Sequence, residues 1–317
     1  MSQRPPEPPP PPGGEPPPEA PSTLDEARVE GGTSATSRRG VARAAGVISA
    51  ATFVSRLLGL VREQVFAIQF GAGYAVDSFQ VAFRIPNLLR DLFAEGAMNA
   101  AFVPTLTQAE HRGGRPAALR LANLVINLLL VKISLICILG VLAAPWLVRI
   151  MAPGFADETG KLALTTLLTQ IMMPYLLFVS LAAAAMGFLN TRRVFFIPAL
   201  SPTMLNVGLI AAGFLLAPLM PRFGLEPIVG MAVGALLGGI GQLALQIPSM
   251  RAQGFSWRPI LSFRDPDVLR MVALMAPAAV GIAAADVNVF VSTFLASTLA
   301  EGSVSWLNYA YRLMQLP

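Results

Sequence analysis

Long apolar stretches alternate with short polar segments along most of this chain. The apolar stretches cover 44–69, 77–107, 121–150, 162–190, 196–218, 227–248 and 268–298, and another begins near 303. Each full stretch can cross ~30 Å of hydrocarbon as a helix. The stretches are continuous and rich in Leu, Ala and small residues, whereas strands of a membrane barrel alternate in polarity. The pattern predicts an all-α integral membrane protein with about seven complete spans and part of an eighth.

Composition agrees with a bilayer environment. Hydrophobic residues make up 54% of the chain and charged residues only 13%, against roughly 25% charged in a soluble domain. One cysteine and one histidine exclude a disulfide framework and leave almost no material for a metal site or a histidine relay. No nucleophile–base pair or glycine-rich phosphate loop is recognisable, so we expect neither an enzyme nor a bound cofactor.

Residues 1–42 differ in kind from the rest. Eleven of the first 21 residues are proline, and a Gly/Ser/Thr/Glu-rich stretch follows. Such a segment cannot bury enough apolar surface to offset its ordering entropy. We expect a disordered cytoplasmic tail; a proline-rich ligand for a partner protein is the less favoured alternative.

The loop cations predict the orientation of the spans. One set of alternating loops carries twelve: Arg38, Arg39, Arg43, Arg112, Arg115, Arg120, Arg192, Arg193, Arg251, Arg258, Arg264 and Arg270. The opposite loops carry Arg149, Lys161 and Arg222. By the positive-inside rule the N-terminus is cytoplasmic. The chain's pI near 10 therefore reflects orientation, and the cations do not form the stripe of a nucleic-acid site.

Several cations lie within the spans themselves. They are Arg56, Arg62, Arg84, Arg90, Lys132 and Arg312. Each costs at least about 2.5–3.5 kcal/mol at mid-membrane, which favours a wet cavity or a partner, although Arg84 and Lys132 could instead snorkel. Arg56 and Arg62 lie about 120° apart on an ideal helix, and Glu63, adjacent to Arg62, does not share its face. Several cavity arginines would bind an anion, phosphate or pyrophosphate above all.

The second span carries polar residues on one face. Arg84, Asn87, Asp91 and Glu95 follow helical spacing. Pro86 is expected to interrupt this helix, and broken membrane helices line cavities. These charges either form internal ion pairs or take part in gating.

Three further polar residues occupy notable positions. Asp77 opens the second span, and Asp286 and Asn288 lie in the middle of the seventh. The mid-span carboxylate of Asp286 can hold a coupling cation or a proton, or it can pair with a cavity arginine. The sequence leaves both readings open.

The chain resembles the lipid II flippase family MurJ, also called MviN, of the MATE-like exporter superfamily. The likeness rests on the segments Ser55–Arg62, Phe70–Phe79, Phe83–Arg90, Leu92–Ala97, Phe102–Pro104, Ala152–Phe155, Pro198–Asn206 and Gly302–Trp306. It covers essentially all of 44–317, and the second-span motif is highly specific.

This resemblance implies a function. The family moves lipid II, an undecaprenyl-pyrophosphate-linked disaccharide-pentapeptide, from the cytoplasmic to the periplasmic leaflet of the bacterial inner membrane for peptidoglycan synthesis. Transport is by alternating access between two six-helix lobes, with two further helices forming a lipid groove. The required cavity arginines correspond to Arg56, Arg62, Arg90 and Arg312, and Asp77 and Glu95 fall on motif positions. A coupling cation of unknown identity is implied, and proteins of cell-wall synthesis are candidate partners.

The resemblance also sets the expected domains and the alternatives. We expect an N-terminal six-helix lobe over 43–260 and the truncated start of a second lobe over 261–317, so that the chain is part of a flippase. The family usually has acids around Arg312, where this chain has Tyr311 and Gln315. An exporter of polysaccharide or drugs from the same superfamily and a non-transporting scaffold for cell-wall synthesis are the alternatives.

Overall fold

The computed structural model describes residues 46, 49–91 and 96–314. The chain divides into two units, Met1–Gly46 and Val47–Pro317, and the second unit contains the helical bundle. The tail predicted to be disordered lies outside the described residues.

Helices are the only regular elements within the described ranges, which confirms the all-α prediction. A helix over 49–70 is followed by α2 (Tyr74–Arg90), α3 (Gly96–Met151), η2 (Pro153–Ala156), α4 (Lys161–Met172), α5 (Tyr175–Thr191), α6 (Phe196–Leu200), α7 (Thr203–Leu215), η3 (Ala217–Phe223), α8 (Ile228–Ala252), α9 (Pro266–Ser297) and α10 (Ser303–Met314).

Five helical segments of the described chain are long and apolar enough to cross a bilayer. They are Ala101–Met151, Lys161–Thr191, Phe196–Leu215, Ile228–Ala252 and Pro266–Ser297. Four of them overlap one predicted span each, whereas Ala101–Met151 contains the predicted span 121–150 and the end of the span predicted at 77–107. The total of seven complete spans remains a prediction.

Proline breaks two of the predicted spans but not the one expected. The span predicted at 162–190 is two helices that meet at Pro174, and the span predicted at 196–218 is divided at Pro202. The helix α2, in contrast, runs through Pro86 to Arg90, so the predicted interruption at Pro86 is wrong. Neighbouring helices can compensate the single backbone hydrogen bond that a proline removes from a membrane helix.

The long element α3 is two helices joined at a pair of glycines. Gly113 and Gly114 have non-helical dihedral angles, and Gly114 has φ of 67°. That left-handed conformation favours glycine because no Cβ clashes with the backbone. The junction separates the spans predicted at 77–107 and 121–150.

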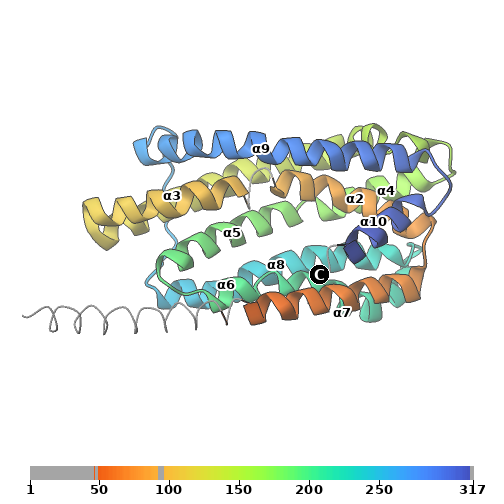
Figure 1. Cartoon of the computed structure of the whole chain (residues 1–317), viewed down its shortest axis with the longest axis horizontal. Coiled ribbons are helices and arrows are strands. Elements are labelled where there is room, and N and C mark those ends of the chain that lie inside the picture. Colours follow the sequence, from red (N-terminus) through yellow and green to blue (C-terminus); the bar gives the residue numbers. More distant parts are fainter. Residues whose placement is uncertain (1–45, 47–48, 92–95, 315–317) are drawn as a thin grey trace, which may run out of the picture. The chain divides into compact units, whose positions relative to one another are not determined.

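The helices pack lengthwise, with α3 beside α5 and α9, and with α8 beside α5 and α7 (Figure 1). The contact between α7 and α8 is made by glycines. A Cβ on Gly208 would lie 2.7 Å from the carbonyl oxygen of Gly234, and a Cβ on Gly238 would lie 2.7 Å from the Cα of Leu205. Small residues let membrane helices approach this closely, where dispersion replaces the hydrophobic driving force.

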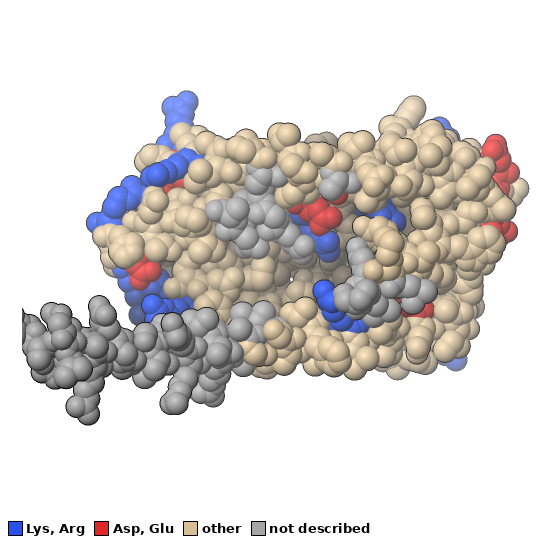
Figure 2. Space-filling view, viewed as in Figure 1, with Lys and Arg blue, Asp and Glu red and all other residues tan. Residues whose placement is uncertain are grey.

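Lysine and arginine side chains gather at one end of the bundle, at the left of Figure 2. Some of these predicted loop cations are paired. Arg112 and Arg120 of α3 form ion pairs with Asp267 and Asp265 at the start of α9, at 2.6 and 3.1 Å. These pairs fasten α9 to α3 near the end where α9 enters the bundle.

We expect Gly238→Ala to lower the thermal unfolding temperature of the protein in detergent. The new methyl group would meet backbone atoms of α7, which cannot rotate away, and such overpacking costs about 1–3 kcal/mol. The matched control is Gly281→Ala, because a Cβ there meets nothing within 4 Å. Equal unfolding temperatures for the two variants would contradict the close α7–α8 contact.

Candidate functional site

A polar cavity of about 530 Å³ lies between the helix at 49–70, α2 and the start of α7. It is lined by Ser55, Arg56, Gly59, Leu60, Arg62, Glu63, Phe83, Asn87, Arg90, Pro202, Leu205 and Asn206. Three of the four arginines predicted to bind substrate therefore line one cavity. Figure 2 shows basic and acidic side chains around a hollow near the middle of this face.

The guanidinium group of Arg62 is held by two neighbours. Its Nη1 donates to Oδ1 of Asn206 at 3.0 Å, and its Nη2 forms an ion pair of 2.5 Å with Glu63. Asn206 in turn donates to the carbonyl of Ser55 at 3.0 Å. Arg62 is only 7% exposed. The interpretation that Glu63 does not share the face of Arg62 is corrected, because both long side chains bend into the same cavity.

Arg90 forms an internal ion pair. Its Nε and Nη2 both donate to Oδ1 of Asp91, at 3.1 and 2.8 Å. Asp286 of α9 lies close enough to interact electrostatically with Arg90 and Asp91. The partly buried Asp286 and the exposed Asn288 line neither this cavity nor any other described one.

Arg56 is the cavity arginine with the greatest freedom. Its side chain is exposed and forms no ion pair with the described residues. Asn87 adds a buried Oδ1 that lacks a hydrogen-bond partner within the described part of the chain. These groups leave hydrogen-bonding capacity directed at the cavity.

The remaining predicted residues have different positions. Arg84 is half-buried on α2 but does not line the cavity, although Asn87 one turn later does. Arg312 belongs to α10, and its side chain lies outside the described part of the molecule. Glu95 falls in the gap at 92–95, also outside the described residues.

Asp77 is the centre of a second, buried polar cluster. It is 1% exposed and accepts hydrogen bonds from the backbone N–H groups of Gly302 and Ser305, at 2.8 and 2.9 Å, and from the Ser305 hydroxyl at 2.5 Å. Ser303 begins α10. Asp77 of α2 therefore caps the N-terminus of α10, where unpaired N–H groups and the helix dipole favour an anion.

The capping is reciprocal. Oε1 of Glu301, just before α10, accepts a 2.6 Å hydrogen bond from the backbone N–H of Tyr74, the first residue of α2. Each helix thus supplies a carboxylate to the N-terminus of the other. Each carboxylate thus lies where the unpaired N–H groups and the dipole of a helix N-terminus favour an anion.

Lys161 completes the Asp77 cluster. Its Nζ lies 3.3 Å from Oδ2 of Asp77 and 2.9 Å from Oε1 of Glu158, and 4.3 Å from the ring centroid of Phe155. Sequence reasoning placed Lys161 among the loop cations, whereas it is 1% exposed. A cation at the first residue of α4 opposes the helix dipole, so Lys161 depends on the nearby carboxylates of Asp77 and Glu158.

Metal ligands do not gather in the described part of the chain. No group of three His, Cys, Asp or Glu side chains there is placed to hold an ion. The arginine cavity instead offers guanidinium groups and the side-chain amides of Asn87 and Asn206, which suit the binding of an anion.

Comparison with known proteins gives a consistent result. The sequence model of the family described as "Lipid II flippase MurJ" matches residues 66–317. The chain is 37% identical over 279 residues to the "Lipid II flippase MurJ" of Burkholderia cenocepacia, covering 87% of this chain and 53% of that protein. It is 37% identical over 278 residues to the "Probable lipid II flippase MurJ" of Vibrio cholerae, covering 86% and 52% respectively.

A solved structure has the same fold. The chain is similar to "Lipid II flippase MurJ, inward closed conformation", with a TM-score of 0.70 and 29% identity over 85% of this chain and 54% of that one. The chain spans about half the length of the curated relatives it matches.

Asp77 and Lys161 should prove coupled in stability. Removing one partner of a buried ion pair costs about 3–5 kcal/mol, so Asp77→Asn should strongly lower the thermal unfolding temperature in detergent. Asp77→Asn combined with Lys161→Met should cost less than the two single losses added together. The control Asp157→Asn removes an exposed carboxylate nearby and should change little. Additive losses for Asp77 and Lys161 would show that the pair is not an energetic unit.

Proposed function

The chain belongs to the lipid II flippase MurJ family, and on that premise we propose that it forms the N-terminal part of a flippase for the lipid-linked peptidoglycan precursor. The observation that carries the proposal is the cavity in which Arg56, Arg62 and Arg90 converge. The bound species is the pyrophosphate of undecaprenyl-pyrophosphate-linked disaccharide-pentapeptide. The flippase moves it from the cytoplasmic to the periplasmic leaflet.

The three arginines of the cavity suit a pyrophosphate, and each has a different set of neighbours that decides how it can reach the ligand. Arg62 is fixed by Asn206, so little side-chain entropy is lost when its fork binds phosphate oxygens. Arg56 has no ion-pair partner among the described residues and can turn toward the ligand. Arg90 forms an ion pair with Asp91, and a dianionic ligand would compete with that carboxylate for the guanidinium group. Three guanidinium groups against the one lining carboxylate, Glu63, favour an anionic ligand.

The Asp77 cluster would serve as the gate. We assign 43–260 to the first six-helix lobe and 261–317 to the beginning of the second, so that Asp77 and Lys161 belong to the first lobe and α10 to the second. The reciprocal caps hold these parts together in one state. Alternating access requires one lobe to move against the other, and the caps must then break while lipid or water replaces them.

Membership of the family also bears on the orientation of the bundle in the membrane and on the energy source for transport. The surplus of arginine at one end of the bundle supports a cytoplasmic location for that end in the bacterial inner membrane. The Asp77 cluster would then face the periplasm. Asp286, which interacts electrostatically with Arg90 and Asp91, is suited to pair with the permanently charged Arg90 after substrate release. A cation drawn in by the membrane potential would compete with Arg90 for that carboxylate.

We expect Arg56→Ala, Arg62→Ala and Arg90→Ala, made separately in the complete protein, to abolish growth of a strain depleted of its own flippase. Each removes a cation of the cavity, and Arg312→Ala should do the same if its side chain joins them. Colony formation is measured, with immunoblotting to show that each variant accumulates in the membrane.

Two controls make the result specific. Arg222→Ala removes an exposed arginine of η3 outside the cavity and should support normal growth. Arg56→Lys keeps the charge but not the bidentate fork and should support partial growth. Normal growth with Arg56→Ala and Arg62→Ala would overturn the assignment of the cavity.

A further inference from the structure

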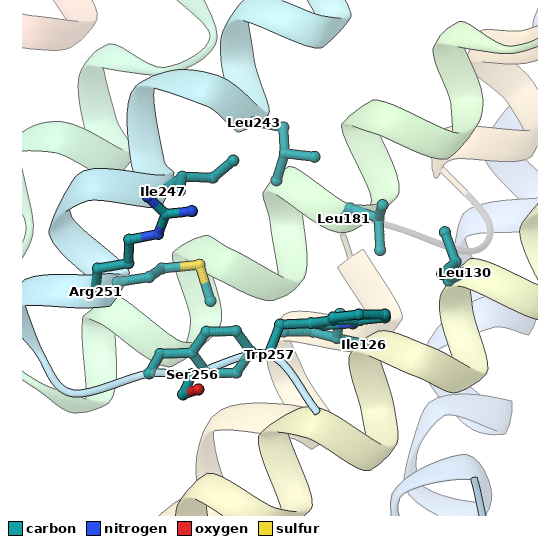
Figure 3. Close-up of a pocket in the computed structure, with 10 residues that line it drawn as sticks. Ile126, Leu130, Leu181, Leu243, Ile247, Arg251, Ser256 and Trp257 are labelled. Carbon is teal, nitrogen blue, oxygen red and sulfur yellow. The ribbon is translucent and has the colours of Figure 1, made fainter. Parts of the chain in front are cut away.

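A second cavity, of about 540 Å³, lies away from the arginine cavity and shares no lining residue with it. It is enclosed by α3, α5, α8 and the segment that follows α8 (Figure 3). Its lining consists of Ile126, Leu130, Leu181, Leu243, Ile247, Met250, Arg251, Phe255, Ser256 and Trp257. The volume falls within the ~300–1,000 Å³ typical of ligand pockets.

The wall formed by the segment after α8 is fixed by two buried asparagines of α3. Asn123 donates to the carbonyl of Ser256 at 3.0 Å and accepts from the backbone N–H of Arg258 at 2.7 Å. Asn127 accepts a 2.9 Å hydrogen bond from the indole Nε1 of Trp257 and donates to the carbonyl of Arg258 at 2.6 Å. The Trp257 ring is therefore a preformed side of the pocket although much of it is exposed.

One end of this pocket is cationic. Figure 3 shows Arg251 at one end, with Leu130 and Leu181 at the other. Arg251 is exposed in the last turn of α8 and forms no ion pair with any described residue. Close by, Arg115 donates to the carbonyl of Gln253 at 2.6 Å, which adds a second positive charge. No acidic side chain lines the pocket.

The arrangement matches an amphiphile lying along a membrane helix. From Leu243 to Arg251 the pocket follows roughly 12 Å of α8, a helix apolar enough to cross the bilayer. A tryptophan and an arginine at the end of a span mark the interface, where headgroups lie. A different groove, between α7 and α8, is lined by Met204, Val207, Gly208 and their neighbours and by no charged residue. That groove therefore offers nothing to bind a headgroup, in contrast to the pocket at Arg251.

We propose that this pocket binds one phospholipid with an anionic headgroup, with the phosphate at Arg251 and an acyl chain between Trp257, Leu181 and Leu130. The positive charge of Arg251 favours an anionic headgroup, and the fixed Trp257 ring gives an acyl chain a preformed surface to pack against. The site is independent of the proposed flippase activity because it shares no residue with the arginine cavity.

The test uses Trp257 as the reporter. The full-length protein, with every other tryptophan changed to phenylalanine, is reconstituted in phosphatidylcholine vesicles. Phosphatidylglycerol or phosphatidylcholine with brominated acyl chains is then added at increasing mole fraction, and quenching of Trp257 is recorded. Because one cation near the surface contributes about fivefold in lipid affinity, brominated phosphatidylglycerol should reach half-maximal quenching at about one fifth the mole fraction.

Variants separate a built site from general attraction to the surface. Arg251→Gln should abolish the headgroup preference, whereas Arg264→Gln, which removes an exposed arginine outside the pocket, should retain it. Leu181→Phe should fill the apolar end of this pocket and weaken quenching by both lipids. Equal quenching by the two headgroups, or the same response in the two arginine variants, would overturn the proposal. Absence of quenching at Trp257, while a variant that retains only the lipid-exposed Trp146 is quenched, would show that protein covers the pocket and would overturn it too.

Discussion

A charged side chain inside a membrane bundle must find a partner, and the Asp77 carboxylate is where this constraint shapes most of the structure. Asp77 satisfies the N-terminus of α10, Lys161 neutralises Asp77, and Glu301 returns a cap to α2. The positions of α2 and α10 thereby become mutually dependent. Since α2 carries Arg90 and α10 carries Arg312, the same contacts that satisfy buried charge also set where the arginine-bearing helices lie.

The charges of the bundle fall into two groups by what satisfies them. Arg112 is paired with an acid on another helix and contributes to architecture. Arg56 has no such partner among the described residues, and Arg62 is held by an amide and an adjacent carboxylate at the edge of a cavity. A lone arginine in a bilayer costs at least about 2.5–3.5 kcal/mol. The proposed anionic ligand would supply the counter-charge that Arg56 lacks among the described residues.

The sequence predicts the spans and the cavity arginines for separable reasons. Hydropathy finds the membrane helices because burial in lipid demands continuous apolar length. Insertion cost marks Arg56, Arg62 and Arg90 as candidates for a cavity, but it marks Arg84, Lys132 and Arg312 equally. Helix geometry does not predict that Arg56 and Arg62 share a cavity, because an ideal helix places them about 120° apart; that expectation comes only from the family resemblance. The path of α2 through Pro86 depends on packing by neighbours, which no local pattern records. The burial of Lys161 depends on Asp77, 84 positions earlier in the chain.

Direct binding most sharply tests whether the arginine cavity recognises the pyrophosphate of a lipid. Native mass spectrometry of the purified complete protein would compare undecaprenyl pyrophosphate with undecaprenol, which has the same chain and no charge. We expect retention of the pyrophosphate lipid, loss of most of that retention in Arg62→Gln, and weak binding of the alcohol by both proteins. Equal retention of the two lipids, unaffected by Arg62→Gln, would contradict that recognition.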